Sequence, residues 1–199
     1  AYSAHTQGIE IPIERYIADV LARTSDKPAE VFSLDVIGDW RASLKNTERM
    51  WEAGICAIPC FHAGEPWDVL VELAKTYPKI ALGGAARMPA RRKLAFAAEC
   101  FKRVWPKKIH GFGFGSPTHI EALPFHSVDA SSWALAPGGF GEWRAFGRAR
   151  GRARGRVSVY GIENVRAEVE YYLALERKAR FIWRREMALL DLLDAGARF

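Results

Sequence analysis

The sequence predicts an α/β fold built on a parallel sheet, and three observations support this class. Short apolar segments alternate with amphipathic segments along the chain as far as Asp129. The connections between these segments are short. The apolar segments are continuous rather than alternating, which is typical of strands that helices cover on both faces. A partial or complete (β/α)8 barrel and an open, doubly wound sheet both fit this order, and we expect the barrel.

The amphipathic segments carry the usual signals of helices. The first, residues 11–23, has apolar residues at helical spacing, and the second, residues 43–54, ends at Gly54. The third has a proline in its first turn, and the last starts with Ser116 as its expected N-cap followed by Pro117. The expected helices are therefore residues 11–23, 43–54, 65–78, 89–106 and 116–123, and the expected strands between and after them are residues 29–35, 55–61, 79–84, 107–113 and 125–129.

The chain after Trp133 has a different pattern. A glycine- and arginine-rich stretch is followed by residues that predict one long or two shorter helices up to Gly196. We therefore expect a barrel portion at 1–140, a basic linker at 141–162 and a helical segment at 163–199. The sequence lacks an initiator Met and starts abruptly, so we expect a natural N-terminus to be missing.

Composition is that of an ordinary globular protein, with 49% hydrophobic and 26% charged residues. No apolar run reaches the roughly 18 residues that a membrane span needs, and no signal peptide is evident. The three cysteines fit no disulfide framework, so we expect buried thiols in a reducing, cytoplasmic setting. No pair of histidines has metal-ligand spacing, and we expect neither a metal site nor a cofactor.

The net charge of +6 is partly concentrated in residues 144–156, which contain six arginines and no acid. Such a run suits the phosphates of a nucleic acid, although a solvated, flexible loop explains it equally well. Alternating arginine and glycine provides charge without fixed geometry and therefore cannot select a sequence. The candidate nucleic-acid-binding residues are Arg144, Arg148, Arg150, Arg152, Arg154 and Arg156.

Polar residues and glycines follow the ends of the expected strands, where parallel α/β folds build their sites. Asp35 and Asp129 each end a strand, so one carboxylate could act as a nucleophile or base and the other could bind a polar substrate edge. Each could instead cap the following segment. Two aspartates with glycines between them favour a functional role. The other candidates at these ends are His62, Gly83, Gly84, His110, Gly111 and Gly113.

These motifs, taken in order, resemble the tRNA-guanine transglycosylase family, and more closely its paralogues that insert 7-deazaguanine bases into DNA in phages and bacteria. The resemblance runs from residue 1 to about Trp133. "AYS" resembles the end of a motif whose Asp-Ser-Gly would lie upstream. The remaining matches, in order, are "SLDVIGD", "FHAGEP", "ALGGAAR", "GFGFGSP" and "HSVDASSW".

The resemblance implies base exchange through a covalent glycosyl-enzyme intermediate, with Asp129 as the nucleophile. It implies that Asp35 accepts hydrogen bonds from the Watson–Crick edge of a purine and that backbone amides near Gly83 and Gly84 meet its carbonyl oxygen. His62 stands where the tRNA enzymes have a glutamine. Those enzymes also carry a cysteine-rich zinc site after the nucleophile, and no cysteine follows Trp133 here. The implied partners are therefore a 7-deazaguanine base and a nucleic acid, either DNA or tRNA, with DNA favoured.

Two alternatives stay open from the sequence. A catalytically silent nucleic-acid-binding remnant would depend on the arginine run alone, and its binding would depend strongly on salt. An unrelated phosphate-binding barrel enzyme would use the residues from Gly111 to Ser116 at a helix N-terminus.

Overall fold

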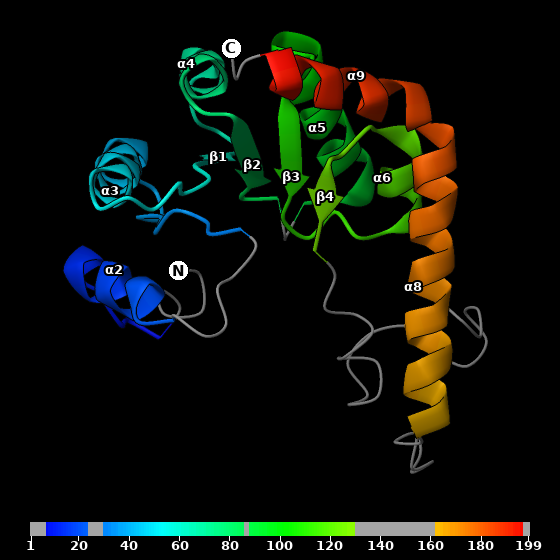
Figure 1. Ribbon diagram of the computed structural model, residues 1–199, viewed down its shortest axis with the longest axis horizontal. Helices are drawn as coiled ribbons and strands as arrows, with labels where there is room; N and C mark the ends of the chain where they lie inside the picture. Colours follow the sequence, from blue (N-terminus) through cyan, green and yellow to red (C-terminus); the bar gives the residue numbers. More distant parts are fainter. Residues whose placement is uncertain (1–6, 24–29, 86–87, 130–161, 197–199) are drawn as a thin grey trace. The chain divides into compact units, whose positions relative to one another are not determined.

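A computed structural model describes residues 7–23, 30–85, 88–129 and 162–196 (Figure 1). The chain divides into two compact units, residues 1–110 and residues 111–199. Each unit is described by itself below.

The strands form one sheet in the order β1-β2-β3-β4, and the alternation of strands with helices confirms the α/β class. Strand β1 (Cys60–His62) runs parallel to β2 (Lys79–Gly83), with His62 opposite Gly83. The other two strands are β3 (Lys108–Gly111) and β4 (Ser127–Val128).

The first unit contains four helices among its described residues, and all four occupy segments that the sequence predicts as helical. They are α2 (Ile13–Leu21), α3 (Trp40–Glu52), α4 (Trp67–Thr76) and α5 (Ala90–Val104). Helix α3 starts earlier than expected because the carboxylate of Asp39 accepts hydrogen bonds from the amides of Arg41 and Ala42, both at 3.0 Å. The cap therefore belongs to Asp39, which leaves Asp35 available for another role.

The strand expected at residues 29–35 is wrong as a strand, because this segment makes only an isolated bridge between Phe32 and Ile58. The amide of Ser33 donates to the carbonyl of Ile58 at 2.9 Å, and the amide of Ile58 donates to Val31 at 2.8 Å. The partner segment then reaches Pro59, which has no amide hydrogen to donate. The expected strand at 55–61 is thereby divided into this bridge and the short β1.

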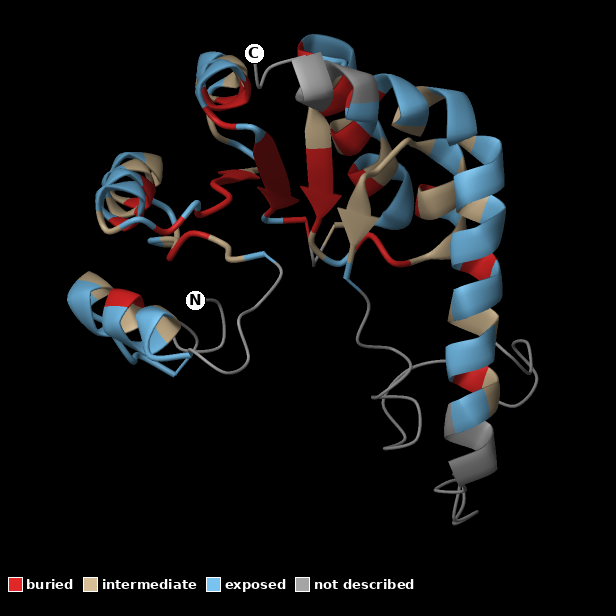
Figure 2. Ribbon diagram, in the orientation of Figure 1, coloured by how far each residue is buried: buried red, intermediate tan, exposed pale blue. Residues whose placement is uncertain are grey.

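The core of the first unit lies on its strands and on one side of each helix (Figure 2). Every residue of β2 is buried, including Lys79, whose ammonium pairs with Glu30 at 2.6 Å. An aromatic cluster joins β1 to α4 and α5, with ring centroids of Phe61, Trp67 and Phe96 between 5.7 and 6.3 Å apart. A second apolar cluster between α2 and α3 centres on Ile17, Met50, Ile55 and Ala57.

The second unit contains α6 (Pro117–Ala122), α8 (Ile162–Ile182) and α9 (Arg184–Gly196). The C-terminal segment thus forms two helices rather than one. Trp183, between them, donates its indole hydrogen to the carbonyl of Ile120 at 3.1 Å, and Lys178 pairs with Glu121 at 2.8 Å. These contacts fasten α8 to α6.

Two details of the second unit differ from the sequence prediction. The side chain of Ser116 does not cap α6, because its hydroxyl is 2.7 Å from Nδ1 of His119. On α8, the helical spacing of apolar residues in the sequence predicts that Leu173 packs inward, but Leu173 is 46% exposed whereas Leu175 is buried.

None of the described helices combines the length and the apolar character that a membrane span requires. The arginine run of residues 144–156 lies outside the described residues, as does Trp133.

Candidate functional site

Asp35, His62 and Glu65 form a charged cluster in the first unit. Nε2 of His62 lies 3.3 Å from Oδ2 of Asp35, and Nδ1 lies 3.1 Å from Oε1 of Glu65. The second oxygen of Glu65 accepts the backbone amide of His62 at 2.9 Å. A carboxylate therefore contacts each nitrogen of the imidazole. The three side chains are only 13–19% exposed, so little water reaches them.

Electrostatics favour a charged His62. Burial disfavours the imidazolium, but the hydrogen bonds to Asp35, Cys60 and Glu65 outweigh it and raise the pKa of His62 to about 12. A cation between two carboxylates is the arrangement that makes their burial tolerable.

Cys60 lies beside this cluster on the same strand as His62. The two residues are two positions apart in β1, so their side chains leave the same face of the strand. Cys60 is 7% exposed, and burial raises the pKa of its thiol to about 11. The thiol is therefore protonated at neutral pH.

Gly83 is required for this arrangement because the side chains of β1 occupy the place of its missing Cβ. A Cβ there would lie 2.7 Å from Sγ of Cys60 and 3.0 Å from Nε2 of His62. Gly84 follows with a φ of +71°, a left-handed conformation that favours glycine. The glycine pair thus makes room for the histidine and turns the chain at the end of β2.

His110 and Gly111 are placed for packing. His110 is 6% exposed, and its ring centroid lies 4.6 Å from that of Phe32. A Cβ on Gly111 would lie 2.8 Å from the ring of Phe125 and 3.0 Å from Phe114. Both positions are therefore packed closely against aromatic rings.

Asp129 follows β4 in the second unit and is exposed. Its carboxylate accepts a hydrogen bond from the backbone amide of Gly113, and its own amide donates to the carbonyl of Gly111 at 3.4 Å. Gly113 has a φ of +69°, which turns its amide in a way that other residues rarely allow. The glycine-rich loop therefore holds a solvent-accessible carboxylate at the end of a strand.

The predicted site residues fall into both units. Asp35, His62, Gly83, Gly84 and His110 belong to the first unit, and Gly111, Gly113 and Asp129 belong to the second. The structure brings Asp35 and His62 together with Gly83, and separately brings Asp129 together with Gly113.

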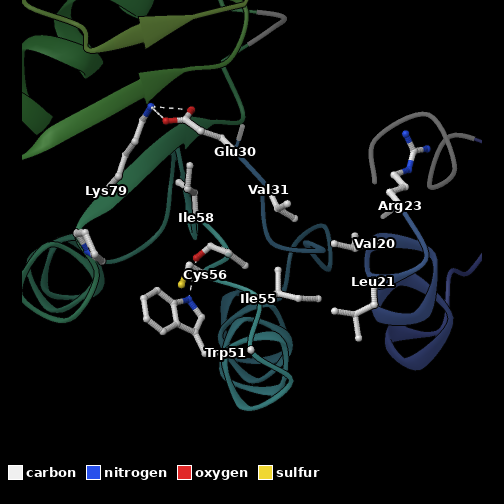
Figure 3. A pocket seen from close by; sticks show the side chains of 13 residues that line it. Val20, Leu21, Arg23, Glu30, Val31, Trp51, Ile55, Cys56, Ile58 and Lys79 are labelled. Carbon is white, nitrogen blue, oxygen red and sulfur yellow. Dashed lines mark hydrogen bonds and ion pairs between the residues drawn. The ribbon is translucent and has the colours of Figure 1, made fainter. Parts of the chain in front are cut away.

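The described residues also line two cavities, and none of the predicted site residues contributes to either. The first, of about 540 Å³, lies between α2 and α3, where Leu21 and Ile55 face one another and the Lys79–Glu30 pair closes one side (Figure 3). Cys56 reaches it and is exposed, so the expectation of three buried thiols is wrong for this residue. The second cavity, of about 620 Å³, lies in the second unit beside α8 and includes Phe125, Trp183 and Met187.

Sequence reasoning missed Cys60 and Glu65. The alternation Cys-x-His within one strand places both side chains on one face, and Glu65 follows His62 at a turn spacing. Both signals are local and were available. Their meeting with Asp35 depends on the bridge between Phe32 and Ile58, which no local pattern indicates.

Comparison with known proteins adds no relative: no protein-family model, no curated protein and no solved structure matches this chain.

Proposed function

We propose that the chain is a base-exchange transglycosylase that replaces guanine by a 7-deazaguanine in nucleic acid, with DNA as the expected polymer. The parallel sheet is then part of a (β/α)8 barrel. The observation that carries the proposal is Asp129, an exposed carboxylate that follows a strand and is held by the amide of Gly113. The resemblance of the motifs in order supports the same role.

The proposed chemistry starts from this carboxylate. An oxygen of Asp129 attacks the anomeric carbon of the target nucleotide, and the glycosidic C–N bond breaks with its electron pair leaving on guanine. Guanine takes up a proton from water as it leaves. The incoming base then loses its ring N–H proton to water, its nitrogen attacks the anomeric carbon, and the C–O bond to Asp129 breaks with its electron pair returning to the carboxylate.

Asp35 and His62 supply the polar groups for recognising a base. Asp35 is an acceptor held in a fixed direction by His62, which suits the N–H groups of a purine edge. Enzymes that act on a base in a duplex take the target nucleotide out of the base stack, and we expect the same here.

The test is formation of a covalent adduct. The chain is incubated with labelled DNA or tRNA in separate reactions and then denatured on a gel. We expect an adduct that Asp129→Asn abolishes and that the matched exposed control Asp19→Asn leaves intact. An adduct that persists in Asp129→Asn, or none with either polymer, would overturn the proposal. Retarded migration on a native gel without an adduct would indicate the silent nucleic-acid-binding alternative.

A further inference from the structure

We propose that Asp35, Cys60 and His62 form a binding site for one Zn²⁺ ion. Each residue offers one ligand atom, and the three atoms lie within 4.8 Å of one another. The proposal does not depend on the proposed base exchange, and it assigns Asp35 and His62 to a metal ion in place of the edge of a base.

The spacing fits a tetrahedral ion. Typical bonds to zinc are about 2.0–2.3 Å long, so tetrahedral ligand atoms lie about 3.3–3.6 Å apart. The distance between Nε2 of His62 and Oδ2 of Asp35 is already 3.3 Å. The remaining pairs lie within 4.8 Å of one another, so an ion would require them to approach by at most about 1.2 Å.

The chemical types of the ligands favour zinc over magnesium or calcium. A sulfur, an imidazole nitrogen and a carboxylate oxygen form a set of intermediate softness, whereas the two lighter cations prefer oxygen alone. Binding displaces the protons on Sγ of Cys60 and Nε2 of His62 to solvent. Three protein ligands leave a fourth position for water or another small ligand.

Glu65 supports this use of His62. One oxygen of its carboxylate lies 3.1 Å from Nδ1 of the His62 ring, and the other accepts a hydrogen bond from the backbone amide of His62 at 2.9 Å. Histidines that bind metals usually donate their other nitrogen to such a carboxylate, which orients the ring and makes it more basic. The ring is thereby turned so that Nε2 points to Asp35 and Cys60.

A further observation points to a missing partner at this site. Oδ1 of Asp35 is buried and has no hydrogen-bond partner among the described residues. Buried carboxylate oxygens are rarely left in this state, because each loses its hydration without compensation. A cation at Asp35 would compensate the buried charge.

The test uses the untagged, metal-free chain and titrates it with Co²⁺ as a spectroscopic probe and then with Zn²⁺. We expect a sulfur-to-cobalt charge-transfer band in the near ultraviolet, with intense visible bands of a tetrahedral site. Zn²⁺ should displace the cobalt at one equivalent per chain.

Variants separate this site from adventitious binding. We expect Cys60→Ser to abolish the charge-transfer band, while the matched control Cys100→Ser, which alters another buried thiol, keeps it. Glu65→Gln should weaken Zn²⁺ binding by about 10- to 100-fold without removing the band. Circular dichroism confirms that each variant is folded.

The absence of a charge-transfer band in the unmodified chain would overturn the proposal, whatever the variants do. A band that survives in Cys60→Ser would also overturn it. Either result would leave the cluster as a histidine cation held between two carboxylates, and neither bears on adduct formation at Asp129.

Discussion

Replacing Gly83 by alanine tests whether close packing of β1 against β2 maintains the charged cluster. The new methyl would lie 2.7 Å from Sγ of Cys60 and 2.9 Å from Cδ2 of His62. The backbone has little freedom to retreat, because Gly83 is paired with His62 in the sheet and its carbonyl accepts the amide of Ala63 at 3.3 Å. The two side chains must therefore move.

The expected cost follows from two contributions. Overpacking of a well-packed interior typically costs about 1–3 kcal/mol. Displacing the imidazole also lengthens its bond to Asp35, and hydrogen bonds to charged groups contribute about 1.5–3 kcal/mol. We expect a loss of about 3 kcal/mol in the free energy of unfolding, which for a chain of this length lowers Tm by about 6–12 °C.

Thermal unfolding of the metal-free chain in the presence of a chelator measures this loss. The control is Gly54→Ala, at a φ of +78° with no atom within 4 Å of the added carbon, which should cost about 1–2 kcal/mol through backbone strain alone. Combining Gly83→Ala with Cys60→Ala removes the closest contact. The double variant should therefore lose less stability than the sum of the two single losses, by more than about 0.5 kcal/mol. Strict additivity, or a Gly83→Ala protein as stable as the unmodified chain, would refute the packing argument.

Three further outcomes are expected. Asp39→Ala should lower the free energy of unfolding by about 1 kcal/mol through loss of the α3 cap. The control Asp19→Ala removes an exposed ion pair and should change the free energy of unfolding by less. Equal losses in the two variants would contradict the capping role. In the folded chain a thiol reagent should label Cys56 rapidly and should reach Cys60 and Cys100 only on unfolding, as mass spectrometry of the labelled peptides would show; rapid labelling of all three would contradict the burial. Burial raises the pKa of Cys100 to about 12, so this thiol contributes stability that is fully present below its unfolded pKa of about 8.5 and is lost as the pH rises towards 12. Cys100→Ala should therefore flatten the decline of Tm across that pH interval. An unchanged slope of Tm against pH would argue against this effect.

Local patterns were sufficient for most helices and for the α/β class. Proline positions, the glycine after α3 and helical spacing of apolar residues are decided within a few residues, and the structure follows them closely. The strand expected at residues 29–35 is wrong, because the pairing of this segment depends on where Pro59 falls in a distant segment.

The candidate site was predictable only in part. Asp35 and His62 were selected independently as strand-end groups, and the fold joins them at 3.3 Å. The spacing of Cys60 and His62 places both side chains on one face of β1, but the position of Cys60 beside Gly83 needed the register of β1 against β2. The burial of His110 could not be inferred either, because it depends on the ring of Phe32 arriving from far away in sequence.

The bridge between Phe32 and Ile58 has a consequence for how the chain opens. Few backbone hydrogen bonds hold the segment before Asp35. The contact of Asp35 with His62 therefore closes the long loop that contains α3. Closing such a loop limits the conformational freedom of the chain between its ends, and the resulting stabilisation increases slowly with loop length. We expect amide hydrogen exchange to accelerate throughout α3 when the contact between Asp35 and His62 is broken, while β2 keeps its protection from exchange.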